Sequence, residues 1–445
     1  MHEEETIVVR KVFTDNSLFF EQNEELEVKL PYAEATDILG TPVQIGKKTA
    51  PNRLVCQPME GCDGTADGAP DELTFRRYRR FAEGGAGLIW FEATACREEG
   101  RANPRQLWIR EDNLDVFKRI VDEIRETSLK KNGYAPLIIM QDTHSGRYSK
   151  PQGKPAPLIA YNNPIFEGEN PIDKSRIVSD EYLDQVKDDM VKAAGLAEKA
   201  GFDGVDIKCC HRYLNSELLS AYNREGRYGG SLENRTRLLR ESVEGARSLC
   251  SDEFLIASRL NVYDGFAYPY GFGVATDGTL DFDPTEPIWL LRELQKAGAE
   301  LVDITMGNPY FNPHVNRPFA AGGYTAEEHP LEGVARMLHG TATLKKEVPE
   351  LKLIASALTY LGVAGPHVAA AFIQENGFDL AGFGRMIFAY PEFAKDILTA
   401  GELDKRKICI CCSKCTELMR GGNTPGCVIR DQLYTDLYRE FKKNN

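Results

Sequence analysis

The chain has 445 residues, 42% of them hydrophobic, and a formal net charge of -13. No apolar run reaches the roughly 18 residues that a membrane span needs, and the acidic N-terminus lacks the basic and apolar segments of a secretory signal. We therefore expect a cytoplasmic protein without a membrane span. The negative charge argues against a nucleic-acid partner, because affinity for a phosphate backbone comes from clustered Lys and Arg.

Eight short apolar runs alternate with segments of helical periodicity along the chain. They begin at residues 53, 87, 136, 203, 254, 300, 352 and 379, and they read RLVCQP, GLIWFE, PLIIMQ, DGVDIK, FLIASRL, ELVDITM, KLIASA and DLAGFG. Parallel strands that are buried on both faces have such near-continuous apolar sequences. Eight of them predict a closed (β/α)8 TIM barrel of the α/β class, with an open doubly wound sheet as the alternative.

One intervening segment shows how clear the helical pattern is. Ser179 is a favourable N-cap, acidic residues follow in the first turn, and Gly201 ends the pattern. The predicted buried stripe consists of Leu183, Val186, Met190, Ala193 and Ala197.

Three long connections each follow a predicted strand. They cover residues 142–178, 261–283 and 307–335. In a barrel these loops lie over the catalytic face. We expect an acidic N-terminal extension (1–40), the barrel (41–400) and a Cys-rich C-terminal segment (401–445).

Polar side chains recur where the predicted strands end. They are Gln57 and Glu60 after the first strand, Gln141 and His144 after the third, Lys208 to Tyr213 after the fourth, Arg259 in the fifth and Arg385 after the eighth. The carboxyl ends of barrel strands meet at one mouth. We therefore predict a shared pocket, with a set of separate structural polar residues as the alternative.

The eighth strand ends in GFGRMIFAYPEF. A glycine before a short helix lets backbone N–H groups approach a phosphate, and Arg385 can bind its oxygens in bidentate fashion. A helix-capping glycine next to a surface arginine is the alternative at this position.

Several longer motifs carry a resemblance that covers roughly 39–427. They are TPVQIGKKTAPNRLVCQPM, GLIWFEAT, QDTHSGR, GFDGVDIKCCHRYLNSELL, NREGRYGGSLENRTR, the ASR of the fifth strand and FGRMIFAYPEF. The chain resembles the Old Yellow Enzyme family of FMN-dependent reductases, in particular the branch related to 2,4-dienoyl-CoA reductase and trimethylamine dehydrogenase. The GRYGGSLENRTR element is the most specific of these motifs.

The resemblance implies an FMN site on this barrel. It assigns Gln57, Pro58, Met59, Glu60 and Ala93 to the flavin, Gln141 to the pyrimidine edge, Arg259 to flavin N1 and O2, and Ser356, Ala357, Gly384 and Arg385 to the phosphate. A cation near N1 suits this chemistry, because a protein tunes a flavin mainly through such contacts.

The resemblance also explains the crowded end of the fourth strand. It implies that Lys208 and His211 polarise a substrate carbonyl and that Tyr213 protonates the α-carbon as a general acid. Lys208 departs from the histidine that is usual in the family. An ion pair with Glu60 is therefore an alternative role for this lysine.

The C-terminal segment, ICICCSKCTELMRGGNTPGC, contains five cysteines. Cys409, Cys412, Cys415 and Cys427 have a spacing that suits a [4Fe–4S] cluster, and relatives with a cluster have one more residue between the second and third ligands. Cys411 would then be a bystander. A structural zinc site is the alternative.

The leading hypothesis is an FMN-dependent ene-reductase that reduces an unsaturated carbonyl compound, such as an enoate, an enone, or a 3-oxo-Δ4 steroid or bile acid. Electrons would come from NAD(P)H directly or from a separate flavoprotein or ferredoxin, because the FAD- and NAD(P)-binding domains of the resembling branch have no counterpart before Asn445. The alternatives are an iron–sulfur amine dehydrogenase, with Cys62 as the thiol for flavin attachment, and a non-catalytic flavin- or zinc-binding barrel. A homo-oligomer is left open.

Overall fold

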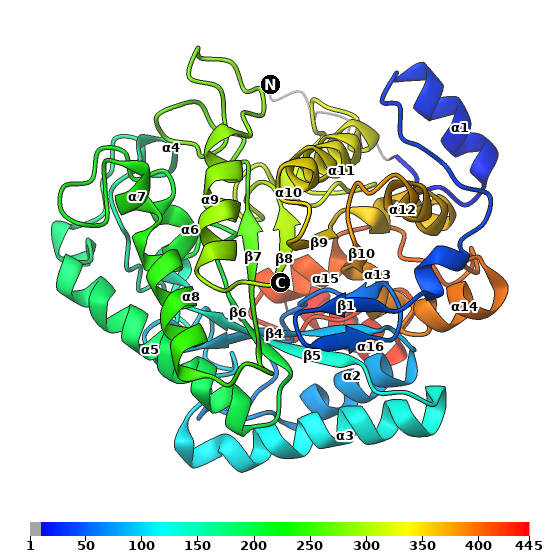
Figure 1. Ribbon diagram of the computed structural model, residues 1–445, viewed down its shortest axis with the longest axis horizontal. Coiled ribbons are helices and arrows are strands. Elements are labelled where there is room, and N and C mark those ends of the chain that lie inside the picture. Colours follow the sequence, from blue (N-terminus) through cyan, green and yellow to red (C-terminus); the bar gives the residue numbers. More distant parts are fainter. Residues whose placement is uncertain (1–9, 445) are drawn as a thin grey trace.

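The computed structural model describes residues 10–444, so that 1–9 of the expected extension and Asn445 lie outside the described part of the chain (Figure 1). Eight parallel strands close into a barrel in the order β10-β3-β4-β5-β6-β7-β8-β9. The strands are β3 (Leu54–Cys56), β4 (Leu88–Ala95), β5 (Leu137–Thr143), β6 (Gly204–Ile207), β7 (Leu255–Asn261), β8 (Leu301–Thr305), β9 (Lys352–Ala355) and β10 (Leu380–Phe383). Each overlaps one of the eight predicted runs, so the closed barrel is confirmed and the open sheet is wrong.

Helices connect successive strands and form the outer layer. They are α2 (Glu72–Glu83), α3 (Leu114–Asn132), α5 (Asp180–Lys199), α8 (Arg237–Leu249), α9 (Thr285–Lys296), α11 (Pro330–Glu347), α12 (Gly365–Gln374) and, after the last strand, α14 (Phe393–Ala400). Helix α5 matches its prediction: the Ser179 side chain accepts a hydrogen bond from the Tyr182 N–H, and the whole predicted stripe is buried. Gly201 follows the helix with φ 87°.

Alternating residues on each strand divide the core into two layers. Leu88 and Trp90 of β4 belong to the cluster inside the barrel, whereas Ile89 and Phe91 belong to the layer between strands and helices. Successive strand side chains point to opposite faces, so a strand that is covered on both sides must be apolar at every position. This double burial explains why the strands were evident in the sequence.

A small antiparallel hairpin precedes the barrel and was not predicted. It consists of β1 (Val43–Ile45) and β2 (Lys48–Ala50). Its buried Val43, Ile45 and Ala50 join the cluster inside the barrel. The hairpin precedes β3, so it closes the barrel at the amino-terminal ends of the strands.

The described part of the N-terminal extension packs against the barrel. It contains α1 (Asn16–Glu25) and η1 (Asp37–Gly40). Phe13 and Phe19 are fully buried, and the Phe13 carbonyl accepts a hydrogen bond of 2.9 Å from the Val363 N–H of η5 (Leu358–Ala364). Residues 10–40 therefore contribute to the core of the molecule.

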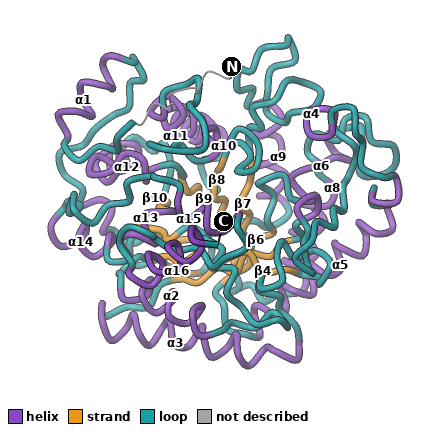
Figure 2. The backbone as a smooth tube through the Cα atoms, turned by 180° about the vertical axis from the view of Figure 1, so that it is seen from behind, coloured by secondary structure: helices purple, strands orange, loops and turns teal. Residues whose placement is uncertain are grey.

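The Cys-rich segment packs against loops that follow the barrel strands. It contributes α15 (Lys414–Arg420) and α16 (Gln432–Lys443), which lie in front of the strands together with the C-terminus in Figure 2. The Cys411 carbonyl accepts from the Ala320 N–H at 3.2 Å, and the Thr424 hydroxyl donates to the Cys62 carbonyl at 3.3 Å. These contacts connect the segment to the loops after β8 and β3.

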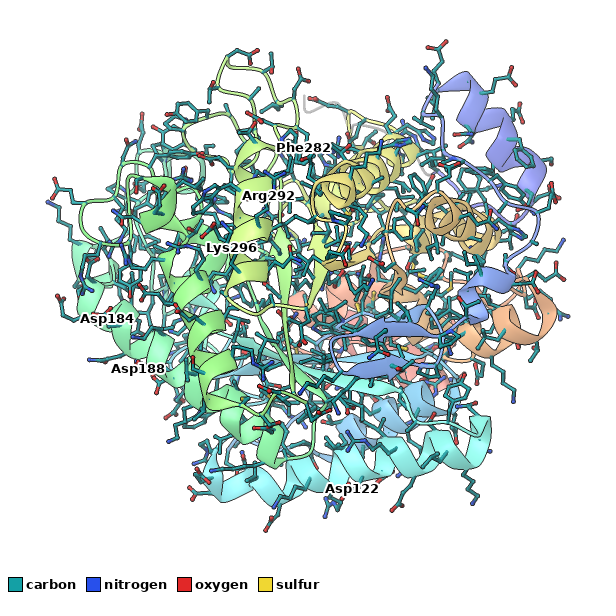
Figure 3. The ribbon with its side chains drawn as sticks, viewed as in Figure 1. Asp122, Asp184, Asp188, Phe282, Arg292 and Lys296 are labelled. Carbon is teal, nitrogen blue, oxygen red and sulfur yellow. The ribbon has the colours of Figure 1, made fainter. Side chains whose placement is uncertain are left out.

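The loops after the strands carry several shorter helices. These are α4 (Pro164–Glu167), α6 (Leu214–Leu218), α7 (Leu232–Arg235), α10 (Pro313–Asn316) and α13 (Arg385–Ala389), with the 3-10 turns η2 (Glu111–Asn113), η3 (Gly146–Tyr148) and η4 (Lys174–Arg176). The outer helices carry exposed charged side chains, among them Asp122 on α3 and Arg292 and Lys296 on α9 (Figure 3). Within residues 10–444, no helix is both long and apolar enough to cross a bilayer.

Candidate active site

A cavity opens where the barrel strands end and encloses about 1140 Å³, its open mouth included. All fourteen residues that the sequence predicts for the catalytic and flavin sites line it: Gln57, Pro58, Met59, Glu60, Ala93, Gln141, Lys208, His211, Tyr213, Arg259, Ser356, Ala357, Gly384 and Arg385. They come from seven strand ends or the loops that follow them. The structure therefore brings the predicted residues together, as a barrel mouth requires.

Buried Asp303 of β8 organises one side of this cavity. The Gln57 amide donates hydrogen bonds to Asp303 Oδ1 at 2.9 Å and to the Ser356 hydroxyl at 2.6 Å. Arg259 forms an ion pair with the same carboxylate, with 3.1 Å between Nε and Oδ2. Burial raises the pKa of Asp303, while the Arg259 charge opposes that shift. This one carboxylate therefore orients three residues of the predicted flavin site.

A second buried carboxylate, Asp206 of β6, orients Gln141. The Gln141 amide donates to Asp206 Oδ2 at 2.6 Å, and the Trp90 indole donates to the same oxygen at 2.8 Å. The Arg259 backbone N–H donates to Asp206 Oδ1 at 2.6 Å. Burial raises the pKa of Asp206 to about 6, and the hydrogen bond from Gln141 acts against the rise. With its NH2 group held in this way, the Gln141 carbonyl oxygen is free to accept a hydrogen bond from a ligand.

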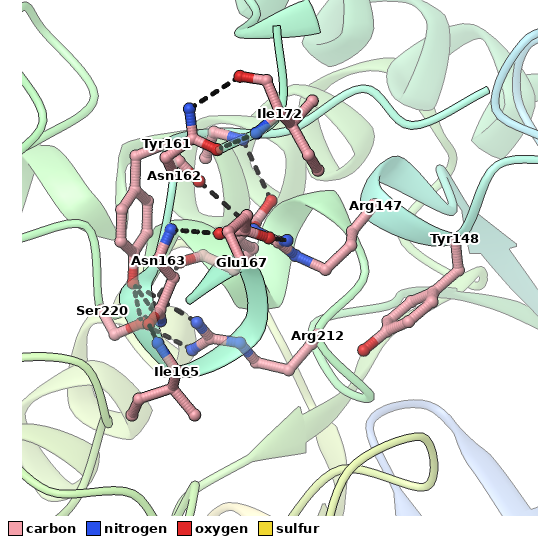
Figure 4. Close-up of polar contacts among 12 residues, drawn as sticks. Arg147, Tyr148, Tyr161, Asn162, Asn163, Ile165, Glu167, Ile172, Arg212 and Ser220 are labelled. Carbon is pink, nitrogen blue, oxygen red and sulfur yellow. Dashed lines mark hydrogen bonds and ion pairs between the residues drawn. The ribbon is translucent and has the colours of Figure 1, made fainter. Parts of the chain in front are cut away.

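The chain turns sharply after β6. His211 and Arg212 both have left-handed backbone conformations, with φ 65° and 57°, which are costly for residues other than glycine. The Arg212 side chain is 1% exposed, and its guanidinium donates to Asp264 Oδ2 at 2.9 Å and to the Ser220 hydroxyl at 2.6 Å. Figure 4 shows this guanidinium directed toward Ser220 and Tyr161. The anchored arginine holds the turn that presents His211 and Tyr213 to the cavity.

Lys208 lies against Tyr213 inside the cavity. Its ammonium is 4.0 Å from the centroid of the Tyr213 ring, and the residue is 3% exposed. The alternative ion pair with Glu60 is not formed: among residues 10–444, no carboxylate lies within 4.0 Å of this ammonium. Burial lowers the pKa of Lys208 and raises that of Glu60. The Lys208 side chain is thus buried without an ion pair within 4.0 Å in the described chain, although Glu60 and Asp206 oppose the lowering of its pKa from a greater distance.

His211 presents a neutral imidazole. Its Nε2 atom is buried and has no hydrogen-bond partner within the described chain. Burial, together with the charges of Lys208 and Arg259, holds the pKa of His211 well below its usual value. Because the folded pKa lies below physiological pH, the ring is uncharged there and can still donate one N–H.

Tyr213 belongs to a group of three tyrosines. Its hydroxyl lies 3.1 Å from the hydroxyl of Tyr310, and the Tyr310 ring stacks on that of Tyr148 with 3.9 Å between centroids. Burial raises the pKa of Tyr213 well above its usual value. The phenol therefore keeps its proton across the physiological range, which a general acid requires.

The far side of the cavity is cationic. Ala357 has a left-handed φ of 75°, and Gly384 directly precedes the short helix α13. The Arg385 guanidinium donates through Nη2 to the Pro318 carbonyl at 2.6 Å, and its buried Nη1 has no partner. Arg317 lies nearby, and burial, reinforced by repulsion from Arg385, lowers the pKa of Arg317 to about 10.

Arg317 and Arg385 form this cationic side without an acidic partner. Within the described chain, no carboxylate forms an ion pair with either guanidinium. Two unpaired cations with a free donor fit a dianionic phosphate, because charge-assisted bonds to phosphate oxygens would satisfy them.

Comparison with known proteins identifies the family. The model of the NADH:flavin oxidoreductase / NADH oxidase family matches residues 39–272, more than half of the chain. The chain belongs to this family. A curated NADH:flavin oxidoreductase of Gibberella zeae is 28% identical over 79% of this chain and 83% of its own length. A curated NADPH dehydrogenase of Bacillus pumilus is 30% identical over 58% of this chain and 70% of its own length.

A solved structure of 2-naphthoyl-CoA reductase in complex with 2-naphthoyl-CoA aligns with a TM-score of 0.71. It is 21% identical and covers 91% of this chain, which in turn spans 58% of that longer chain. At this identity the alignment shows the shared fold alone. The protein is thus an FMN-dependent oxidoreductase with the barrel of the NADH:flavin oxidoreductase family.

The residues present fit FMN. The cavity has unpaired cations and a free Arg385 donor on one side, and oriented amides with a guanidinium from Arg259 on the other. A flavin mononucleotide has the same polarity, with a phosphate at one end and a ring that gains negative charge on reduction at the other. The polarity of the cavity therefore matches that of the cofactor.

The cysteines of the C-terminal segment border a second, smaller cavity of about 370 Å³. Its lining includes Cys409, Cys411, Cys412, Cys415 and Cys427. The Cys411 N–H donates to the Cys409 sulfur at 3.4 Å. Among the described residues, no group of three or more Cys, His, Asp or Glu side chains converges as one metal ion would require.

Sequence reasoning missed four residues around this site. Asp303 and Asp206 lie inside apolar strands. An acidic residue at a position predicted to be buried was the one sign in the sequence that they belong to the site. Tyr310 and Arg317 lie in the long loop 307–335, which was recognised as functional but not residue by residue. In both cases the role depends on contacts between distant segments of the chain.

Proposed function

We propose that the protein is an ene-reductase that reduces the C=C bond of an α,β-unsaturated carbonyl compound. The observation that carries the proposal is the convergence of Tyr213, His211 and Lys208 on the same cavity as Gln141 and Arg259. Bound FMN would supply the hydride for the β-carbon. Tyr213 would supply the proton for the α-carbon, so that one proton and one hydride complete the reduction.

Lys208 and His211 are suited to bind the carbonyl oxygen. Within residues 10–444, His211 Nε2 has no hydrogen-bond partner and the Lys208 side chain forms no ion pair within 4.0 Å. A charged donor is stronger than a neutral one in such surroundings. Drawing electron density toward that oxygen makes the β-carbon more electrophilic, and donors already in place cost no reorganisation during reaction. A carboxylate or a ketone would satisfy the pair equally well, which is why enoates, enones and 3-oxo-Δ4 steroids all remain suitable test substrates.

Gln141, Arg259 and the phosphate-facing arginines would hold the cofactor. Asp206 accepts hydrogen bonds from the Gln141 amide and the Arg259 backbone N–H, and Asp303 forms an ion pair with the Arg259 guanidinium. We assign Arg317 to the phosphate site beside Ser356, Ala357, Gly384 and Arg385. NAD(P)H, whose use the family supports, is the proposed electron donor at the same mouth.

Amine oxidation fits this cavity less well. An amine substrate is a cation, and the cavity already contains the Lys208 and Arg259 side chains. Like charges in a poorly hydrated site repel strongly. The Glu60 carboxyl also lines the cavity, but burial raises its pKa and so disfavours the anion that would attract an amine. Cys62, the thiol considered for flavin attachment, is buried and accepts a hydrogen bond from Asn103 at 3.3 Å.

The proposal predicts that an alkene will reoxidise the reduced protein. The purified protein should show flavin absorbance, and anaerobic photoreduction followed by an enone, an enoate or a 3-oxo-Δ4 steroid should restore the oxidised spectrum with one equivalent of saturated product. The saturated ketone is the matched control and should leave the flavin reduced. If only the imine product of a secondary amine reoxidises the flavin, the result favours the amine dehydrogenase. A colourless protein favours the non-catalytic barrel. Either result would contradict the proposal.

We further propose that the C-terminal cysteines hold a [4Fe–4S] cluster. What supports it is the ferredoxin-like sequence spacing of four of the five thiols that border this cavity. The proposed ligands are Cys409, Cys412, Cys415 and Cys427. The cluster would exchange single electrons with a separate flavoprotein or ferredoxin.

The ligand set can be tested with two adjacent serine variants. Cys412→Ser should lose most of its iron and acid-labile sulfide after anaerobic reconstitution, because three thiolates bind a cube more weakly than four. Cys411→Ser is the matched control and should retain about four iron atoms per chain. If Cys411→Ser loses the iron while Cys412→Ser keeps it, the ligand set shifts to Cys411; if the unmodified protein binds no iron, the cluster is excluded.

A further inference from the structure

The proton supply of Tyr213 raises a structural question. Tyr213 is 2% exposed, so bulk water has almost no direct access to it. The hydrogen-bond partner of its hydroxyl is the hydroxyl of Tyr310, at 3.1 Å. The Lys208 ammonium lies over the face of the Tyr213 ring rather than in line with its hydroxyl. A phenol in this position needs a route by which its proton is replaced.

Tyr310 is held in a fixed orientation beside this hydroxyl. Its backbone N–H donates to the Asn308 side chain at 2.9 Å, and the Asn308 amide donates to the Tyr148 hydroxyl at 3.0 Å. The Tyr148 ring stacks on the Tyr310 ring at an interplanar angle of 25°. These contacts leave the Tyr310 hydroxyl directed to Tyr213, with little freedom to turn away.

Tyr310 also reaches toward the outside of the cavity. It is partly exposed, whereas Tyr213 is buried. The neighbouring Pro309 carbonyl accepts a hydrogen bond of 2.7 Å from Arg420, an exposed residue of α15 at the cavity mouth. Tyr310 is thus the more exposed of the two hydrogen-bonded phenols, and its neighbour Pro309 is bonded to a residue at the cavity mouth.

We propose that Tyr310 is a proton relay that restores the proton of Tyr213 after each turnover. The inference rests on the proposed function, in which the Tyr213 O–H bond breaks as its proton passes to the α-carbon. The resulting Tyr213 phenolate takes the proton of Tyr310, and Tyr310 regains one from water. The net change is one solvent proton delivered to the product, with no change in oxidation state at either tyrosine.

The relay predicts that loss of the Tyr310 hydroxyl affects the first turnover much less than the later ones. In Tyr310→Phe, Tyr213 still carries its own proton, so a single oxidation of photoreduced protein by an enone should stay within about threefold of the unmodified rate. The steady-state kcat with excess donor should fall about 10- to 100-fold, because each later turnover waits for proton replacement. A small acid such as imidazolium should restore part of that loss.

Tyr148→Phe is the matched control, since its hydroxyl bonds to Asn308 and not to Tyr213 or Tyr310. The variant keeps the ring that stacks on Tyr310 and the bond from the Tyr310 N–H to Asn308. It should leave both rates within about threefold, and the flavin content and melting temperature of both variants should match the unmodified protein. The relay is overturned if Tyr310→Phe keeps its steady-state kcat, or if its single-turnover rate falls as far as its kcat, which indicates a purely structural contact. Failure of any alkene to oxidise the unmodified protein is a different result, and it removes the proposed function itself.

Discussion

Tyr213→Phe is expected to slow the oxidation of the photoreduced flavin by an enone about 10²- to 10⁴-fold, the usual cost of losing one general acid. Burial raises the pKa of the Tyr213 phenol, which is therefore protonated at neutral pH. Phenylalanine has no proton to give. The reduction of the flavin by NAD(P)H needs no proton at the α-carbon and should change by less than about threefold. Stopped-flow absorbance of the two half-reactions, recorded separately, measures both rates.

A comparison with Tyr148→Phe separates chemistry from packing. Tyr148 lies near the same substrate space, with 6.1 Å between its ring centroid and that of Tyr213, but its hydroxyl is bonded to Asn308. Removal of that hydroxyl should leave enone-driven oxidation nearly unchanged. If Tyr213→Phe slows both half-reactions equally, the residue supports the cofactor and does not donate the proton.

The barrel could be predicted from the sequence because its physical cause is local. Strands covered on both faces must be apolar at each position, and β4, with every residue buried, shows this directly. The hairpin β1–β2 was missed because three-residue strands carry too little periodicity to be recognised. The burial of Phe13 and Phe19 was missed for a different reason: Phe13 contacts residues about 350 positions further along, and Phe19 packs on Phe13.

The site was predictable to the extent that each residue follows a strand. Position alone placed Gln141, Lys208 and Arg259 at the mouth, and the resemblance supplied their roles. It could not supply Asp303, whose importance comes from orienting Gln57, Ser356 and Arg259 at the same time. Nor could it indicate that Tyr310 would meet Tyr213, because loop conformation is set by packing between distant segments.

Asp264→Ala should lower the free energy of unfolding by about 3–5 kcal/mol, because it leaves the Arg212 guanidinium buried without its carboxylate. Both side chains are 1% exposed, and Asp264 also accepts hydrogen bonds from the Phe272 N–H and the Asn261 amide. The shift of the urea unfolding midpoint measures the effect. Enone-driven oxidation should fall as well, since the turn after β6 loses the anchor that presents Tyr213.

Glu347→Ala tests whether burial, rather than charge pairing as such, causes this cost. Glu347 pairs with Arg292 at 2.7 Å, but both side chains are about half exposed, and Figure 3 shows Arg292 on the outer surface of α9. Water replaces the lost partner of an exposed guanidinium, so the expected change is below about 1 kcal/mol. Equal losses in the two variants would mean that Arg212 is hydrated in the folded state. The two strained residues of the β6 turn would then need another source of support than the Arg212–Asp264 pair.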